Sequence, residues 1–119
     1  MLNPIKLANK DFLSSLDTSS EELLHILEIA KNFKNNNLNI ELKNKVLGLI
    51  FDKCSTRTRV SFQVAMSRLG GTTVDLNPNT SQIGRGEPIK DTARVLSRYC
   101  DVLAIRTFNQ SDLEEYAKW

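Results

Sequence analysis

Residues 46–51 have the sequence Val-Leu-Gly-Leu-Ile-Phe, an unbroken apolar run. The run is too short for a solitary helix, and it suits a strand that is buried on both faces of a parallel sheet. Ser55-Thr56-Arg57-Thr58-Arg59 come shortly after it, and apolar residues at helical spacing resume beyond them. This part of the chain therefore predicts a buried strand, a polar turn and the start of a helix.

Two further strand–helix units continue this pattern. Residues 72–76 and 102–105 predict a second and a third strand. Further helices are expected after Ser19, from Pro88 onward and over residues 112–119. The alternation predicts an α/β fold with three layers, in which helices flank a parallel sheet and the crossovers are right-handed.

Apolar stripes mark the faces that the helices are expected to bury. The first helix carries a capping box of Ser19 and Glu22, and Gly70-Gly71 is expected to end the second helix. The stripes are Leu23, Ile26, Leu27, Ala30 and Phe33 in the first helix; Val60, Val64 and Leu69, with Phe62, Ala65 and Met66 beside them, in the second; and Ile89, Thr92, Ala93 and Leu96 in the third.

The composition excludes several classes of protein. The chain has 119 residues, of which 40% are hydrophobic and 25% charged, as is typical of one globular domain. Its net charge of +2 comes from scattered lysines and arginines, without the basic run and interleaved aromatic residues of nucleic-acid binders. No apolar run approaches a membrane span, and residues 1–10 carry no secretory or transit pattern. We expect a cytoplasmic protein that binds neither nucleic acid nor a membrane.

The two cysteines, Cys54 and Cys100, have neither metal-site spacing nor the spacing of a redox pair. We expect two reduced thiols, although the fold could still bring them together as a disulfide. His25 lies on the first predicted helix, away from any other reactive group, and is expected to be a surface or boundary residue.

The start of the second helix has the features of an anion site. Ser55 can cap this helix, and the N–H groups that follow have no partner within it. The helix dipole places partial positive charge there. Thr56 and Thr58 add hydroxyl donors, and Arg57 adds a forked cation that matches a phosphate face. The alternative is an ordinary helix cap with two solvated arginines.

The predicted topology brings a second cation to the same place. If the second and third strands lie on opposite sides of the first, a switch point falls between strands one and three. The carboxyl ends of those strands carry Ser55–Thr58 and Arg106-Thr107. Arg106 on the far edge of the sheet from Ser55 would contradict this strand order.

Other phosphate motifs are absent from the sequence. It has no Gly-x-x-x-x-Gly-Lys-Ser/Thr loop and no Gly-x-Gly-x-x-Gly after a strand, which argues against nucleoside triphosphates and dinucleotides. Gly84-Arg85-Gly86 alone is a weak signal.

Three blocks resemble the aspartate and ornithine carbamoyltransferase family, in order along the chain. Residues 51–62, Phe-Asp-Lys-Cys-Ser-Thr-Arg-Thr-Arg-Val-Ser-Phe, resemble its carbamoyl-phosphate signature. Residues 86–96, Gly-Glu-Pro-Ile-Lys-Asp-Thr-Ala-Arg-Val-Leu, resemble its second block, and Ile105-Arg106-Thr107-Phe108 resemble the third. Within the second block, residues 91–96 resemble the ornithine branch more than the aspartate branch.

The resemblance implies a Rossmann-like carbamoyl-phosphate-binding domain and a role for each matching residue. Ser55, Thr56, Arg57 and Thr58 would hold the phosphate, with Thr58 also near the carbonyl oxygen. Arg106 would help hold the phosphate and polarise the carbonyl, and Gln82 would close over carbamoyl phosphate at a subunit boundary. Arg57, Thr58 and Arg106 are thus the implied catalytic residues, and the chemistry needs neither a metal nor a cofactor.

Four further residues receive other roles. The resemblance implies that Arg59 and Glu87 form a structural pair that joins two segments. Cys54 stands where the family often has proline and is expected to be structural. Arg85 is a weaker candidate for the site, since related aspartate enzymes carry a lysine there.

The resemblance also implies what should lie beyond residue 119. The family continues with a fourth strand, a His-Pro-x-Gln block and a second domain that binds the amino-acid substrate. We therefore expect residues 1–119 to form an incomplete carbamoyl-phosphate domain, cut before its fourth strand. The implied activity of the whole protein is carbamoyl transfer to the side-chain amine of ornithine, giving citrulline and phosphate in arginine metabolism, within a homotrimer or a higher homo-oligomer.

Other functions remain open at this point. The chain could belong to an aspartate carbamoyltransferase or to another carbamoyltransferase with the same first domain. It could also be a module that binds carbamoyl phosphate or phosphate without transferring a group. An interaction protein that uses an exposed sheet edge has no positive motif in this sequence.

Overall fold

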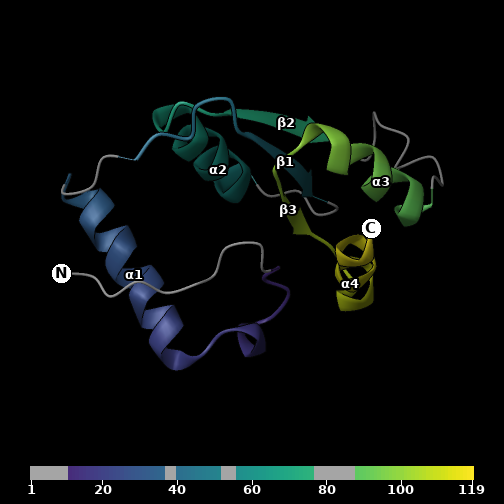
Figure 1. Ribbon diagram of the computed structural model, residues 1–119, viewed down its shortest axis with the longest axis horizontal. Coiled ribbons are helices and arrows are strands. Elements are labelled where there is room, and N and C mark those ends of the chain that lie inside the picture. Colours follow the sequence, from purple (N-terminus) through teal and green to yellow (C-terminus); the bar gives the residue numbers. More distant parts are fainter. Residues whose placement is uncertain (1–10, 37–39, 52–55, 77–87) are drawn as a thin grey trace. The chain divides into compact units, whose positions relative to one another are not determined.

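The structure, a computed structural model, describes residues 11–36, 40–51, 56–76 and 88–119 (Figure 1). Chain contacts divide it into two units, Met1–Ile40 and Glu41–Trp119. The two units are described separately below.

The first unit contains a short 3-10 helix, η1 (Ser15–Asp17), and the helix α1 (Ser20–Lys34). Ser19 caps α1: its hydroxyl accepts from the Glu22 N–H at 3.1 Å, and the Glu22 carboxylate accepts from the Ser19 N–H at 2.9 Å. This confirms the predicted capping box. None of the residues of α1 is buried, and Leu27 from the expected stripe is 65% exposed.

Within the described residues, the second unit contains one sheet of three parallel strands. The strands are β1 (Val46–Phe51), β2 (Thr72–Leu76) and β3 (Val102–Arg106), in the order β2-β1-β3. The first two match their predicted bounds, and the third is one residue longer than predicted. The central strand is the apolar run, as expected for a strand covered on both faces.

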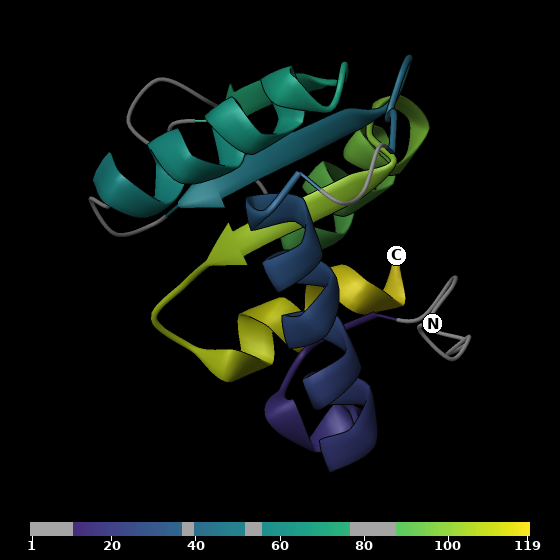
Figure 2. The same cartoon turned by 90° about the vertical axis from the view of Figure 1, so that its left-hand side faces the viewer.

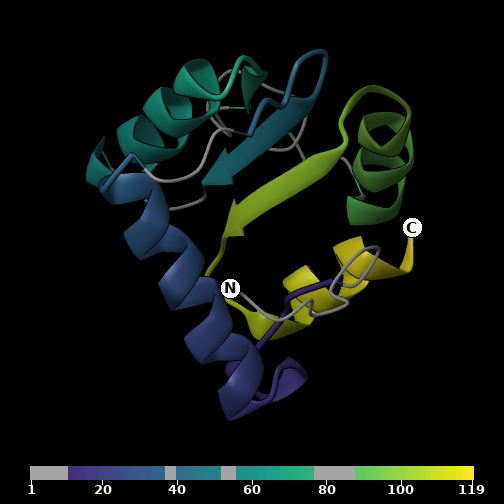
Figure 3. The same cartoon turned by 60° about the vertical axis from the view of Figure 1, so that its left-hand side comes forward.

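Helices cover both faces of this sheet, as the α/β prediction requires (Figures 2 and 3). Alternate residues of β1 point to opposite faces. Leu47, Leu49 and Phe51 pack with Met66 of α2 (Thr56–Arg68). On the other face, Ile50 packs with Ala93 and Leu96 of α3 (Ile89–Tyr99) and with Tyr116 of α4 (Gln110–Lys118).

The apolar stripe predicted for α2 is wrong in part. Val60 and Val64 are 47% and 42% exposed, and Met66 is the one buried residue of this helix. The side that faces the sheet instead carries Arg59 and Gln63, which are partly buried and lie at helical spacing before Met66. Long polar side chains can cover apolar surface with their stems, so a polar residue here replaces the expected apolar one.

Gly70 and Gly71 end α2 as predicted. The Gly71 N–H donates to the Met66 carbonyl at 2.9 Å, and the Gly70 N–H donates to the Ser67 carbonyl at 3.1 Å. These two bonds form a Schellman motif. Gly70 has φ +86°, a left-handed conformation that a side chain would strain.

The stripe predicted for α3 is confirmed, since Thr92, Ala93 and Leu96 are buried. Pro88 lies one position before this helix, as its N-cap, and not in its first turn. The helix α4 begins at Gln110, before the expected Asp112. Its end contacts α3, because the Lys90 ammonium and the Arg94 guanidinium lie 4.8 and 4.6 Å from the centre of the Trp119 ring.

Gly48 lets β1 pack closely against its neighbours. A Cβ atom at this position would lie 2.6 Å from the Leu103 Cδ2 and 3.1 Å from the Cys100 Sγ. A larger residue would therefore have to displace the Leu103 and Cys100 side chains.

Among the described residues, no helix has both the length and the apolar character needed to span a membrane.

Candidate anion-binding site

The switch point predicted from the sequence is present in the sheet. Since β2 and β3 lie on opposite sides of β1, the chain reverses its direction of winding between β1 and β3. Arg106, the last residue of β3, is in register with Phe51, the last residue of β1. Figure 3 shows the arrowheads of these two strands pointing to the same end of the sheet. The strand-order hypothesis is confirmed.

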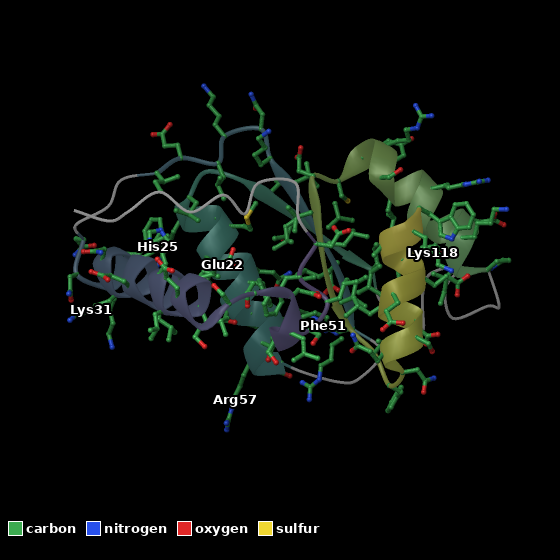
Figure 4. The ribbon with its side chains drawn as sticks, turned by 60° about the horizontal axis from the view of Figure 1, so that its bottom comes forward. Glu22, His25, Lys31, Phe51, Arg57 and Lys118 are labelled. Atoms are coloured by element: carbon green, nitrogen blue, oxygen red, sulfur yellow. The ribbon has the colours of Figure 1, made fainter. Side chains whose placement is uncertain are left out.

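The first turn of α2 lies close to this end in the chain. Thr56, the first residue of α2, follows Phe51 closely enough that the two can be at most roughly 18 Å apart. Thr56, Arg57 and Thr58 are all exposed. Figure 4 shows the Arg57 side chain extending outward from the helix. Arg106 is also exposed.

Two predicted site residues, Ser55 and Gln82, lie outside the described residues, as do Cys54, Arg85 and Glu87. Their predicted roles stay predictions. Of the six predicted binding residues, the structure therefore describes Thr56, Arg57, Thr58 and Arg106.

The described part of the site is electropositive. The first turn of α2 contains no acidic residue, and its N–H groups carry the positive end of the helix dipole. Neither Arg57 nor Arg106 forms an ion pair with another described residue. Both guanidinium groups thus lack a carboxylate partner among the described residues, and each can donate two parallel hydrogen bonds to a phosphate.

Arg59 behaves differently from Arg57, although both belong to the first turn of α2. Its Nε lies 3.4 Å from the Asp75 Oδ2 of β2, and its guanidinium lies 5.9 Å from the centre of the Phe51 ring. The expected partner Glu87 lies outside the described residues. The sequence analysis missed Asp75, whose only signal was a carboxylate near the end of a predicted strand.

The residue after Arg106 is tied to α4. The Thr107 hydroxyl lies 3.4 Å from the Asp112 carboxylate, a long hydrogen bond that links the end of β3 to the first turn of α4. This contact restrains the backbone next to Arg106.

The described cysteine has no features of a nucleophile. Burial, and secondarily the charge of Asp101, raises the pKa of the Cys100 thiol, so the thiol is protonated at neutral pH. The 119-residue chain shows no cluster of three or more His, Cys, Asp or Glu that could hold a metal among its described residues.

Residues 10–119 match the family described as aspartate/ornithine carbamoyltransferase, carbamoyl-P binding domain. The chain belongs to this family.

Carbamoyltransferase relatives cover the whole chain. The ornithine carbamoyltransferase of Prochlorococcus marinus subsp. pastoris is 77% identical over 119 residues, which are 100% of this chain and 39% of that protein. The chain thus spans about two fifths of the length of this relative.

Solved carbamoyltransferases share the fold. The ornithine carbamoyltransferase from Pyrococcus furiosus is 47% identical, with a TM-score of 0.86 over 97% of this chain and 38% of that one. Aspartate transcarbamoylase from Trypanosoma cruzi, in complex with carbamoyl phosphate, is 30% identical, with a TM-score of 0.83 over 99% of this chain and 40% of that one. The ornithine enzyme is the more similar of these two in sequence.

Proposed function

We propose that this chain is the carbamoyl-phosphate-binding part of an ornithine carbamoyltransferase. One observation carries the proposal: Arg106 ends β3 directly beside the end of β1, and β1 leads into the helix that begins with Thr56, Arg57 and Thr58. The 77% identity to an ornithine carbamoyltransferase supports the choice of ornithine as the second substrate.

The proposed reaction transfers a carbamoyl group without a metal or covalent intermediate. The side-chain amine of ornithine attacks the carbonyl carbon of carbamoyl phosphate and gives up a proton. The bond from that carbon to the phosphate oxygen then breaks, leaving citrulline and phosphate. The tetrahedral oxyanion formed on the way needs donors that are already in position.

The proposed roles follow from this chemistry. Arg57 and the N–H groups at the start of α2 hold the phosphate and stabilise the charge that grows as it departs. Thr58 and Arg106 also help to hold the phosphate, and both donate to the carbonyl oxygen. Ser55, Thr56 and Gln82 complete the phosphate site.

The rest of the proposal concerns the whole protein. Residues 1–119 would form the carbamoyl-phosphate domain, and ornithine would bind to an amino-acid domain in the remaining three fifths of a protein of the relatives' length. We further propose a cytoplasmic homotrimer, or a higher homo-oligomer, that acts in arginine metabolism.

The test is an assay of the full-length protein with carbamoyl phosphate and either ornithine or aspartate. The proposal predicts citrulline from ornithine and no product from aspartate. Carbamoylated aspartate would identify an aspartate enzyme instead. Calorimetry with carbamoyl phosphate tests for a binding module that transfers no group. Heat of binding without any product would indicate such a module.

A further inference from the structure

The two arginines at the start of α2 point in different directions. Successive residues of a helix are rotated by about 100°, so residues two apart lie on nearly opposite sides. Arg57 is exposed, whereas the Arg59 side chain is 25% exposed and lies against the sheet. One arginine is thus available to a ligand, and the other is available to hold the helix.

Arg59 joins the helix to two strands. Its guanidinium contacts Asp75, near the end of β2, and the ring of Phe51, the last residue of β1. Asp75 is an exposed residue whose side chain is 32% exposed, so the ion pair is partly covered. Water screens such a pair less than it screens a fully exposed one.

Phe51 connects this contact to the other cation of the site. The Phe51 side chain is 4% exposed, and its residue is in register with Arg106 on β3. Its ring also meets the Phe62 ring of α2 edge-on, with centres 6.4 Å apart and planes at 70°. The first turn of α2 therefore rests against the residue of β1 that is in register with Arg106.

The pair depends on charge more than on hydrogen-bond geometry. The Arg59 Nε is buried and has no well-aligned hydrogen bond within the described part of the chain, although the Asp75 carboxylate lies 3.4 Å away. Removing the carboxylate charge should therefore release the guanidinium, even if the size of the side chain at position 75 is kept.

We propose that Arg59 and Asp75 are positioning residues that fix the first turn of α2 against the sheet. They thereby set the distance between Arg57 and Arg106 and the affinity for carbamoyl phosphate. This inference rests on the function proposed above. Helix termini fray unless they are tied down, so an untied first turn would spend part of its time with Arg57 away from the ligand.

The test compares two matched substitutions in the full-length protein. Asp75→Asn removes the pair with Arg59, and Asp101→Asn removes the pair between Asp101 and Lys45 at the other end of the sheet. Asp75→Asn should raise the dissociation constant for carbamoyl phosphate roughly two- to fivefold, the range expected for losing one partly covered ion pair. Asp101→Asn should leave that constant unchanged, because Asp101 lies at the amino end of the sheet.

A double-substitution cycle tests the coupling of the pair. Arg59→Lys should weaken binding by a similar factor, because lysine lacks the planar fork. Adding Asp75→Asn to Arg59→Lys should then cause little further loss. The value of kcat at saturating carbamoyl phosphate should change less than KM in all three variants.

Three results would contradict the proposals, and they separate a failure of the positioning role from a failure of the proposed function. If the wild type binds carbamoyl phosphate and Asp75→Asn binds it as tightly as Asp101→Asn does, the positioning role is wrong. Additive losses in the cycle would also contradict it. If the wild type does not bind carbamoyl phosphate, the proposed function itself fails.

Discussion

The two ends of the β-sheet differ in how their polar groups are used. At the amino end, the Asp101 carboxylate accepts from the Val46 N–H at 2.8 Å and lies 3.8 Å from the Lys45 ammonium. The Asp101 N–H donates to the Val46 carbonyl at 2.9 Å, which joins the starts of β1 and β3. At the carboxyl end, Arg57 and Arg106 are exposed and form no ion pair with other described residues.

This difference separates a structural end from a binding end. Polar groups that are paired within the protein stabilise the fold, and charged groups left open to solvent can bind a ligand. Parallel α/β sheets bind their ligands at the carboxyl ends of the strands. Substitutions at the two ends should therefore affect different properties, with activity most sensitive at the carboxyl end and stability at the amino end.

The largest expected effect is that of Arg57→Ala in the full-length protein. Loss of a donor to the departing phosphate should lower kcat about 100-fold or more. The stability of the Arg57→Ala variant should match that of an Arg68→Ala variant. Arg68 is an exposed arginine in the last turn of the same helix. Steady-state kinetics and thermal unfolding of both variants measure this. Near-normal turnover in Arg57→Ala would show that the assigned role is wrong.

Next in size is Gly48→Ala, in the amino half of β1. The added Cβ would lie 2.6 Å from the Leu103 Cδ2, so the free energy of unfolding should fall by about 1–3 kcal/mol. Denaturant unfolding measures this change. The control is the double substitution of Gly48→Ala with Leu103→Val. Valine has no Cδ2 atom, so the clash is removed and part of the lost free energy of unfolding should be recovered. An unchanged midpoint for Gly48→Ala would contradict the packing described here.

A smaller loss is expected for Asp101→Ala. It leaves the Val46 N–H without its side-chain acceptor, so we expect a loss of about 1 kcal/mol with no change in the KM for carbamoyl phosphate. Lys45→Met breaks only the exposed ion pair and should cost less than about 0.5 kcal/mol. Equal losses of stability in Asp101→Ala and Lys45→Met would contradict the hydrogen bond from the Val46 N–H to the Asp101 carboxylate. A raised KM for carbamoyl phosphate in Asp101→Ala would contradict the separation of the structural end of the sheet from its binding end.

The smallest effect concerns the pH dependence of stability. The pKa of the Cys100 thiol is raised in the folded protein, first by burial and then by Asp101. This group therefore stabilises the fold fully below its unfolded pKa, and that contribution is lost as the pH rises through the folded pKa. Unfolding midpoints between neutral and alkaline pH should fall more steeply for the wild type than for Cys100→Ala. Parallel curves would contradict this.

The sequence was sufficient to predict the strands of the sheet, whereas the strand order that places the switch point was a hypothesis that the sheet confirms. The strand Val46–Phe51 is apolar without interruption, and this pattern specifies burial on both faces. The carboxyl end of α2 was also predictable, because the two glycines after it permit the left-handed turn at Gly70.

The side of α2 that faces the sheet could not be predicted from apolar periodicity. Arg59 lies on that side because its charge is compensated by Asp75 and its stem packs near Phe51. These partners are brought together only by the folded sheet. The same reason explains why Asp75 was missed: a carboxylate in a strand gives no signal of which residue it will meet.

The most direct test of the account is a crystal structure of the full-length protein with carbamoyl phosphate. We predict that the phosphate lies at the first turn of α2, within hydrogen-bonding distance of Arg57, and that Arg106 contacts the same carbamoyl phosphate. A carbamoyl phosphate bound elsewhere, or one that Arg106 cannot reach, would contradict the assignment of the carboxyl end of the sheet as the binding end.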